Sequence, residues 1–522
     1  MRRSILLLAV LPASLTAQAG PDTAPRSEMV RASGNPILAN GRHYSTDPAP
    51  LVDGDTLYIL AGRDEAKAGV NDFIMNEWQL LATDDPASAR WRHFPAVARP
   101  ETLFAWAEPG RAYAGQIVKG PDGRFYLYAS VLERDSDARD RFAIGVAVAN
   151  SPTGPWRDAH PSGPIVSQRT PEPNHIQNID PTVLVDDDGR VYLYWGTFGQ
   201  PRAIELDRDM VTPKGREQRV EGLTGFFEAP WIMKRRGIYY MLYAGNEAGP
   251  DSACTPAVYH ACQAYATATS PLGPWTYRGV LLKPVSSTTS HAGAVDFKGQ
   301  WYLTYHTADA KEGGHFRRSV AIDRMEWDDG VTPAAIRVMA PTQRSRPAPP
   351  STRNLAPAAT VVSEMPVHVQ YRIKALNDGI VRASPLPPDM WGTWRGDDNP
   401  ALAWVEYRWE RPVTLDASRL RFFADQPAGS DVGVAPPRRW RLEYWDRGWK
   451  PVAASTPYGT DALRVEEVRF RAVTTRCLRA VFEAAGTGGK RAGIAVQEWE
   501  ALRPAAGPAT AAPARPPAPC HR

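Results

Sequence analysis

The chain has 522 residues and a formal net charge of +4, and its lysines and arginines form no basic stripe. This balance gives no reason to propose nucleic acid as a partner. The length is sufficient for two or three domains. Beyond the N-terminus, no apolar run reaches the roughly 18 residues that span a bilayer, so we expect a soluble mature protein without a membrane partner.

The N-terminus has the three parts of a secretory signal peptide. A basic head, Met1-Arg2-Arg3, is followed by a short apolar run from Ile5 to Leu11 and by the small-residue site Ala17-Gln18-Ala19. Such a run is too short to be a permanent anchor. We therefore expect residues 1–19 to be cleaved after Ala19 and the mature protein to be secreted or periplasmic.

Five segments repeat one pattern, in which a short apolar stretch leads into an x-Gly turn and then into an aromatic strand. This pattern is typical of a β-hairpin with a tight glycine turn. The segments run from Asp53 to Leu60, Asp122 to Tyr128, Asp188 to Trp195, Arg236 to Tyr243 and Lys298 to Tyr305. Each repeat is long enough for four strands, so the sequence predicts an all-β, five-bladed β-propeller over residues 30–340. An irregular β-sandwich would not require five copies of one hairpin.

A second motif, Ser-Pro-x-Gly-Pro-Trp, occurs at residues 151–156 and 270–275, and a looser form begins at Thr83. We expect these segments to be the outer turns of blades.

After the repeats, the composition changes twice. Residues 341–353 form a proline-rich polar linker that cannot pack a core. Strand patterns resume over residues 354–502, at the density expected of a jelly-roll or similar β-sandwich. Residues 503–522 are rich in alanine and proline, and we expect a disordered tail.

Three acids stand at equivalent places in three of the repeats. Asp47 and Asp180 each precede a proline at the entrance to a hairpin, and Glu228 stands two residues before Pro230. Because the innermost strands of a propeller line its axis, we expect the three acids to share one cleft. Glu228 also lies among three large aromatic residues, and apolar surroundings raise the pKa of a carboxyl group toward neutrality, as a general acid requires.

The motifs around these acids resemble those of glycoside hydrolase family 43, the five-bladed propeller enzymes that act on arabinose- and xylose-containing glycans. The resemblance covers residues 35–335 and is carried by Asn35-Pro36-Ile37-Leu38, Thr46-Asp47-Pro48, Asn178-Ile179-Asp180-Pro181, Phe227-Glu228-Ala229-Pro230, Tyr243-Ala244-Gly245-Asn246-Glu247, His291-Ala292-Gly293 and Arg317-Arg318-Ser319-Val320. It implies that Asp47 is the general base, Glu228 the general acid, and Asp180 the residue that orients the acid and tunes its pKa.

The same resemblance implies a set of binding residues. His291 would lie near a cation at the propeller axis, often calcium, with contact through water, and Arg318 would contact the sugar. Neighbouring side chains on a strand alternate, so Arg317 and Arg318 cannot both face the pocket. The chain departs from the family at Tyr113-Ala114-Gly115-Gln116, where Trp-Ala-Pro-Gln is common, and Gln116 is assigned to the sugar pocket. Three aromatic residues are open to two interpretations, as sugar platforms or as hairpin packing: Trp106, Phe226 and Phe227.

Residues 354–502 resemble a coagulation-factor-5/8 type C, or discoidin-like, domain. The likeness is carried by Asn354-Leu355-Ala356, Leu376-Asn377-Asp378-Gly379, Trp404-Val405-Glu406-Tyr407 and the stretch from Gly493 to Glu500. It implies glycan binding, with calcium near the Asn-Asp-Gly loop, or else a structural role in capping the propeller. Trp391 and Trp394 share a loop with Asp397 and Asp398, and we expect both tryptophans to be exposed and to stack on sugar rings.

The four cysteines fall into two pairs. Cys254 and Cys262 bracket one short loop, and in a chain that leaves the cytoplasm we expect a disulfide between them. A metal site that includes His260 would lack a fourth ligand and regular zinc spacing. The sequence leaves open whether Cys477 and Cys520 pair.

These observations predict a secreted exo-glycosidase that removes terminal α-L-arabinofuranosyl or β-D-xylosyl residues from plant polysaccharides or oligosaccharides, with inversion and without an organic cofactor. One alternative is a propeller that only binds glycan, which the complete set of three acids disfavours. Another is a glycosyl transferase or phosphorylase on a related scaffold, which the absence of a glycine-rich phosphate loop disfavours. The sequence indicates no oligomeric state.

Overall fold

The computed structural model describes residues 26–505, apart from short gaps, and Cys520. The gaps are residues 33, 68–69, 71, 247–253, 255–260, 286–288, 343–351, 369–370, 380, 382–384, 386–388 and 487–488. The predicted signal peptide, most of the linker, most of the tail and His260 therefore lie outside the described residues. Within the described part of the chain, no helix is long and apolar enough to cross a membrane.

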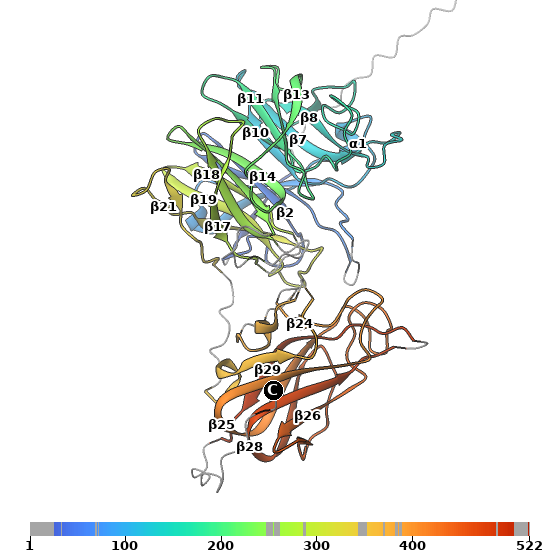
Figure 1. Cartoon of the computed structure of the whole chain (residues 1–522). Helices are drawn as coiled ribbons and strands as arrows, with labels where there is room; N and C mark the ends of the chain where they lie inside the picture. The colour runs from blue at the N-terminus through green and yellow to red at the C-terminus, as the bar shows by residue number, and fades with distance from the viewer. Residues whose placement is uncertain are drawn as a thin grey trace, which may run out of the picture.

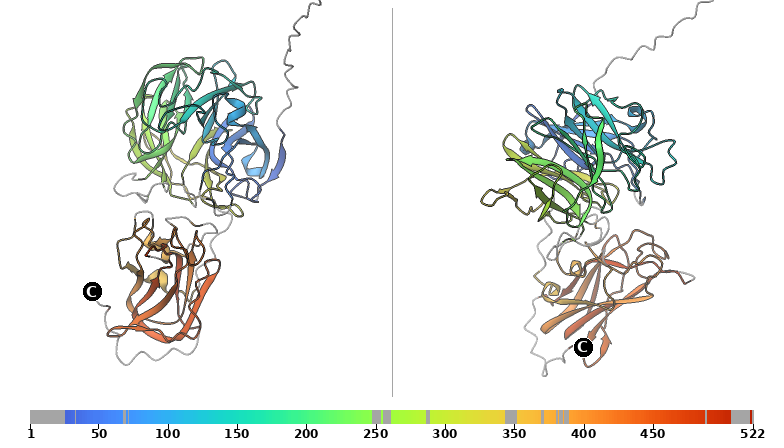
Figure 2. Two further views of the ribbon diagram at one scale, coloured as in Figure 1. Left: turned by 90° about the vertical axis from the view of Figure 1, so that its right-hand side faces the viewer. Right: turned by 45° about the horizontal axis from the view of Figure 1, so that its top comes forward.

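The five repeats form the five blades of a β-propeller, which confirms the predicted fold (Figures 1 and 2). Blade I contains β2 (Thr46–Asp53), β3 (Thr56–Gly62), β4 (Trp78–Thr83) and β5 (Arg90–Ala98), with β1 (Glu28–Arg31) paired outside β5. Blade II contains β6 (Gly115–Lys119), β7 (Phe125–Leu132), β8 (Phe142–Ala149) and β9 (Arg157–Asp158). Blade III contains β10 (Thr182–Val185), β11 (Val191–Trp195), β12 (Arg202–Leu206) and β13 (Pro213–Arg219).

The chain continues around the ring in the same way. Blade IV contains β14 (Phe226–Arg235), β15 (Ile238–Gly245), β16 (Cys262–Ala268) and β17 (Thr276–Leu282), and blade V contains β18 (Ala292–Phe297), β19 (Gln300–Thr307) and β20 (Ser319–Arg324). Three short elements accompany the blades: η1 (Pro86–Ser88) lies between β4 and β5 of blade I, α1 (Pro100–Leu103) lies between blades I and II, and the pair β21 (Trp327–Asp328) and β22 (Ala335–Ile336) follows blade V.

Glycine accounts for the hairpin between the two innermost strands of every blade. A tight turn of this kind needs positive φ, which glycine adopts without steric cost. The turn glycines have φ between 56° and 82° in all five blades, at Gly54, Gly123, Gly189, Gly237 and Gly299. The Ser-Pro-x-Gly-Pro-Trp motifs lie between the third and fourth strands of blades II and IV, and the looser form lies between β4 and β5. Both predicted kinds of turn are therefore confirmed.

The ring closes between the first and last blades. Each innermost strand contacts the innermost strand of the next blade, and β18 contacts β2. On the outer side of β20, the Asn35 side chain forms the hydrogen bonds that a neighbouring strand would form. Its Nδ2 donates to the Ile322 carbonyl at 2.9 Å, and its Oδ1 accepts from the Ile322 N–H at 3.0 Å. The segment before β2 thus satisfies the free edge of the three-stranded blade V.

The second body is a β-sandwich, drawn in orange and red in Figure 1, as predicted. Its strands are β23 (Thr360–Ser363), β24 (Trp391–Gly392), β25 (Leu402–Phe423), β26 (Arg439–Trp445), β27 (Trp449–Pro451), β28 (Val465–Glu483) and β29 (Ala495–Leu502), with 3-10 turns η2 (Ala356–Ala358) and η3 (Ile373–Leu376). The long strands β25 and β28 pair along their length, with a break in register between Arg408 and Val413. The buried rings of Tyr407 and Trp499 stack at 4.1 Å in its core.

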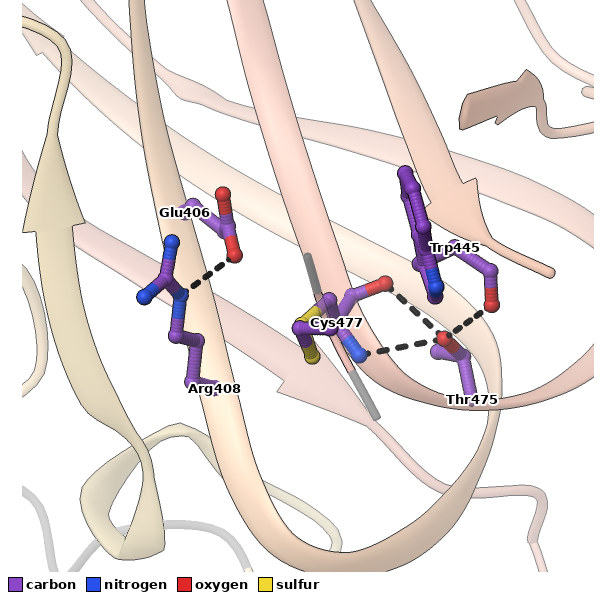
Figure 3. Close-up of a disulfide and its surroundings, with 6 residues drawn as sticks. Glu406, Arg408, Trp445, Thr475 and Cys477 are labelled. Atoms are coloured by element: carbon purple, nitrogen blue, oxygen red, sulfur yellow. Dashed lines mark hydrogen bonds and ion pairs between the residues drawn. A yellow bond between two sulfur atoms is a disulfide. The ribbon is translucent and has the colours of Figure 1, made fainter. Parts of the chain in front are cut away.

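Two disulfides are present. The predicted bond between Cys254 and Cys262 is confirmed, and Cys477 pairs with Cys520, which settles the pairing that the sequence left open. Figure 3 shows the Cys477 bond beside Thr475, whose hydroxyl accepts from the Cys477 N–H at 3.1 Å. Because Cys477 lies in β28 and is fully buried, the second bond fixes residue 520 to the core of the sandwich.

Candidate active site

The propeller carries a cavity of about 220 Å³ into which all three predicted acids point. Asp47 comes from blade I, Asp180 stands just before the inner strand of blade III, and Glu228 comes from blade IV. Pockets for drug-sized ligands have about 300–1,000 Å³, so this smaller cavity suits one sugar ring rather than a chain.

The backbone bends in the same way beside each of the three acids. Asp47, Asp180 and Ala229 have positive φ values of 51°, 62° and 55°, and each precedes a proline. In β2 and β14 the pairing register shifts at these residues. Such irregularities re-aim side chains at the rims of sheets, and a left-handed non-glycine residue costs about 1–3 kcal/mol. The repeated acid-proline motif is therefore the sequence signal for a bend that directs carboxylates into the cavity.

Asp47 is held as an anion. Arg318 Nη1 donates to its Oδ1 at 3.1 Å, the Thr46 hydroxyl donates to the same oxygen at 3.0 Å, and His291 Nδ1 lies 3.8 Å away. Burial by itself favours the neutral acid, but the charge of the Arg318 guanidinium outweighs it and holds the pKa of Asp47 far below its ordinary value. Asp47 can therefore accept a proton at neutral pH.

His306, which the sequence did not single out, fixes the position of Asp47. Its Nδ1 accepts from the Asp47 N–H at 3.1 Å, and its Nε2 donates to the Thr289 carbonyl at 2.8 Å. A backbone N–H can only donate and a carbonyl can only accept, so these contacts assign the proton to Nε2 and make the ring neutral. His306 therefore supports the strained backbone at Asp47 rather than supplying a charge.

Arg318 is itself held by Asp64, a second residue that the sequence did not identify. Its Nε and Nη2 each donate to the Asp64 carboxylate at 2.9 Å, and its backbone N–H donates to Asp64 Oδ2 at 2.8 Å. Both residues are only 2% exposed. Arg317 turns away, and its Nε donates to the Glu312 carbonyl at 2.6 Å. The expectation that only one of the two arginines faces the pocket is thus confirmed.

Glu228 and Asp180 form a second, opposite environment. The Thr197 hydroxyl donates to Glu228 Oε2 at 2.9 Å, and the Ala229 N–H donates to Asp180 Oδ2 at 3.1 Å. Burial, together with the charge of Asp47, raises the pKa of Glu228 to about 7. Burial and the charge of Glu228 also raise the pKa of Asp180. Two carboxyl groups that repel each other in a buried site retain a proton that neither would hold alone.

The residues predicted to contact sugar divide into two groups. Arg318 lines the cavity, whereas Gln116, Phe227 and Trp106 are not among its lining residues; His291, predicted to lie near a cation, also lines it. Gln116 Oε1 accepts from the Val183 N–H at 2.5 Å and so joins blade II to blade III.

The three predicted aromatic residues pack within the fold. Trp106 stacks on Phe104 at 5.1 Å, Phe226 packs on Tyr243 at 5.7 Å, and the rings of Phe227 and Phe198 pack edge-to-face with centroids 5.6 Å apart. The structure supports the interpretation of these rings as packing residues rather than sugar platforms. Different aromatic residues line the cavity instead: Phe73, Tyr113, Phe142 and Phe198.

The surroundings of His291 do not form a cage for a directly bound metal. Among the described residues, the one group of three close metal-ligating side chains is Glu406, Cys477 and Cys520. Glu406 and Cys477 belong to the second domain and not to the propeller, and the two sulfurs form a disulfide. Calcium prefers six to eight oxygen ligands, and burial lowers the pKa of His291 to about 4, which leaves a neutral imidazole at the cavity wall. A hydrated cation beside His291 stays a prediction.

The expectation of two exposed tryptophans in the second domain is wrong for Trp391. This residue is 1% exposed, pairs with Val496 through β24, and packs 5.8 Å from Phe482 in the core. Trp394 is half-buried and covers Gly493. A two-residue strand between irregular segments leaves too little periodicity in the sequence to reveal that Trp391 faces inward.

A sugar-sized cavity that holds one ionised carboxylate and two carboxyl groups of raised pKa meets the requirement of glycoside hydrolysis for a base and an acid in one site. On this fold it defines a glycoside hydrolase. The chain belongs to the glycosyl hydrolases family 43, whose model matches residues 33–332.

Two curated relatives agree with this assignment, and one solved structure is similar to the chain. The chain is similar to a xylosidase/arabinosidase from Bacteroides ovatus, with 30% identity over 332 residues that cover 55% of this chain and 92% of that protein. It is similar to a beta-xylosidase from Xylanibacter ruminicola, with 29% identity over 55% of this chain and 94% of that protein. A solved structure of an alpha-L-arabinofuranosidase from Clostridium thermocellum ATCC 27405 is 30% identical over 57% of this chain and 93% of that chain, with a TM-score of 0.46.

Proposed function

We propose that the protein is a secreted or periplasmic exo-glycosidase that hydrolyses terminal α-L-arabinofuranosyl or β-D-xylosyl residues with inversion of the anomeric centre. The observation that carries the proposal is the opposite surroundings of two carboxyl groups in one cavity: Asp47 accepts from the Arg318 cation, whereas Glu228 is buried beside the neutral Thr197 hydroxyl, and its pKa is raised to about 7. The names of the relatives support the substrate class. The small cavity supports attack on a terminal residue.

Asp47 acts as the base in this proposal. It takes a proton from a water molecule while the water oxygen forms a bond to the anomeric carbon. Arg318 keeps Asp47 ionised before the step. The Asp64 carboxylate keeps Arg318 in place, and the buried Arg318 Nη1 faces the cavity.

Glu228 acts as the acid. As the bond between the anomeric carbon and the leaving oxygen breaks, Glu228 gives its proton to that oxygen, so one proton enters Asp47 and one leaves Glu228. The pair shares one proton, and the proposal assigns it to Glu228 and the negative charge to Asp180, which disfavours a second charge on Glu228. The hydrogen bond from Ala229 to Asp180 couples the positions of the two groups.

Two leaving groups test the roles. Asp47→Ala should abolish hydrolysis of both a nitrophenyl glycoside and a disaccharide, because no water is activated. Glu228→Ala should spare the nitrophenyl glycoside, whose leaving group needs little protonation. Asp53→Ala, at the far end of β2, is the control, because Asp53 pairs only with Lys119 at the surface. Equal loss of both substrates in Glu228→Ala would remove Glu228 from the role of acid.

The stereochemistry has its own test. Inversion requires about 6.5–9.5 Å between the two catalytic carboxyl groups, which leaves room for the attacking water. Proton NMR of the first product formed should show the inverted anomer, and a retained anomer would contradict the assignment of Asp47 as base. If neither nitrophenyl glycoside nor oligosaccharide were hydrolysed while glycan still bound, the alternative of a binding propeller would hold.

For the second domain, we propose glycan binding with calcium near the Asn377-Asp378-Gly379 loop. The Gly379 N–H donates to Glu498 Oε2 at 3.2 Å, and the buried Oε1 of Glu498 has no hydrogen-bond partner within the described residues. A buried carboxylate oxygen without a partner suits a calcium ion, which prefers oxygen ligands. Removal of residues 354–522 should weaken binding to polymer and leave hydrolysis of a nitrophenyl glycoside nearly intact. An inactive or insoluble product would indicate a structural domain.

A further inference from the structure

The turn between β11 and β12 places a strained, exposed aromatic ring at the rim of the cavity. Phe198 is 52% exposed and lines the cavity, and its φ is +50°. The next residue, Gly199, has φ of +75°, and the Gln200 N–H donates to the Thr197 carbonyl at 3.1 Å. These are the features of a type I′ turn, in which asparagine, aspartate or glycine is favoured at the place that Phe198 occupies. Phenylalanine there lowers the stability of the turn, which indicates a use for the ring.

The turn is attached on both sides to segments that carry the catalytic acids. The Gly196 N–H donates to the carbonyl of Ile179, next to Asp180, at 2.9 Å. The Gly199 N–H donates to the carbonyl of Phe227, next to Glu228, at 3.1 Å. The position of Phe198 relative to the acids is therefore set by the backbone of the two neighbouring segments.

The hydrogen bond from Thr197 indicates which end of the cavity Phe198 occupies. Its hydroxyl donates to Glu228 Oε2 at 2.9 Å, so that oxygen is an acceptor, and the acidic proton belongs on Oε1. A general acid protonates the oxygen of the leaving group, so the leaving saccharide lies on the Glu228 side of the cavity. Phe198, one residue from Thr197, is on that side. Phe73 lies under the Arg318 guanidinium at 5.0 Å, on the Asp47 side.

From this arrangement we infer that Phe198 is the platform of an aglycone subsite, stacking on the pyranose ring of the saccharide that leaves. The inference rests on the proposed function and adds to it the class of leaving group. The rings of Phe198 and Phe227 pack edge-to-face at an interplanar angle of 74°, which orients the Phe198 ring, and the 52% exposure of Phe198 leaves ring surface available for a ligand. Sugar rings have an apolar C–H face that packs on aromatic faces. Phe198 would thus favour substrates in which another sugar follows the cleaved bond.

The test compares two substrates that share the sugar to be cleaved. One is a disaccharide, xylobiose or arabinofuranosyl-xylose, and the other is the corresponding glycosyl fluoride, whose leaving group has no ring. Phe198→Asn removes the ring and suits the turn, so the Tm should stay the same or rise while the ratio of kcat/KM for disaccharide over fluoride falls about tenfold. Phe198→Tyr keeps the ring and should keep the ratio within about twofold. Phe142→Ala removes a different cavity-lining ring, one that packs on Tyr113, and should lower both rates and leave the ratio unchanged.

Each outcome decides the matter. An unchanged ratio in Phe198→Asn, with an active wild type, overturns the aglycone subsite and leaves the proposed function intact. A parallel fall with both substrates overturns it as well, because it would give Phe198 a role in the cleaved sugar's site or in the fold. A wild type that hydrolyses neither substrate would overturn the proposed function, and the subsite with it.

Discussion

The buried pair of Glu228 and Asp180 makes the pH dependence of the reaction a direct test of the division of labour in the cavity. The pKa of Glu228 rises from 4.5 to about 7, and at about 1.36 kcal/mol per pH unit this favours its protonated form by roughly 3 kcal/mol. Burial is the main cause and persists in any variant that keeps the fold. Asp180→Asn removes the negative charge that the proposal assigns to Asp180, so the pKa of Glu228 should fall, on the order of one pH unit, and stay above its ordinary value.

The sign of the effect follows from the role of the acid. Glu228 works when protonated, so activity falls as the pH rises through its pKa, and a lower pKa moves this basic limb to lower pH. The assay is kcat/KM across pH on a disaccharide, whose leaving group needs protonation. Asp188→Asn, on the same blade, is the control, because Asp188 is exposed and pairs with Arg190. A basic limb that stays in place in Asp180→Asn, or moves to higher pH, would refute the reasoning.

Three further changes have distinct expected results. Asp64→Asn leaves the buried guanidinium of Arg318 without its main partner, so the free energy of unfolding measured in urea should fall by about 3–5 kcal/mol, and a loss below about 1 kcal/mol would contradict the described support. Calcium should raise the Tm of the wild-type protein after treatment with a chelator but not that of Glu498→Gln, and an equal rise in both would place the ion elsewhere. Cys520→Ser opens a disulfide to Cys477 with a sequence separation of 43; by loop-closure entropy this should destabilise the second domain by about 4 kcal/mol, and an unchanged denaturation midpoint would contradict that contribution.

The sequence predicted those parts of the molecule that repeat. A turn glycine recurs in five blades, and an acid stands before a proline in two of the inner strands, so each copy supports the interpretation of the others. The family likeness then assigned roles to Asp47, Asp180 and Glu228, and the structure brings these three residues together in one cavity. A motif that occurs once has no other copy in the chain with which its interpretation can be compared.

The supporting residues could not be predicted because their partners are distant in sequence. Asp64 and Arg318 are 254 residues apart, and 259 residues separate the Asp47 N–H from His306. Nothing near Asp64 distinguishes it from the many surface acids of the chain. For Gln116, the sequence suggested a role that the structure does not show. Its place in a family motif suggested a sugar contact, but its side chain accepts a hydrogen bond from the backbone of the next blade. Which polar side chains face a partner depends on how the blades pack, and local sequence does not encode this.

A difference of one residue between the blades explains how a repeated motif supplies both a base and an acid. In blades I and III the left-handed residue is itself the aspartate, but in blade IV it is Ala229, and the acid is the residue before it. The N–H of Ala229 therefore donates to Asp180. Glu228 accepts from the hydroxyl of Thr197, and within the described residues no arginine donates to it. Asp47, at the left-handed position of blade I, meets Arg318 instead. Asp47 is in direct contact with the Arg318 cation, whereas Glu228 is in contact with a neutral hydroxyl, and this difference separates the two pKa values. The offset in blade IV thus gives the cavity its direction, with water activated at one end and the leaving group protonated at the other.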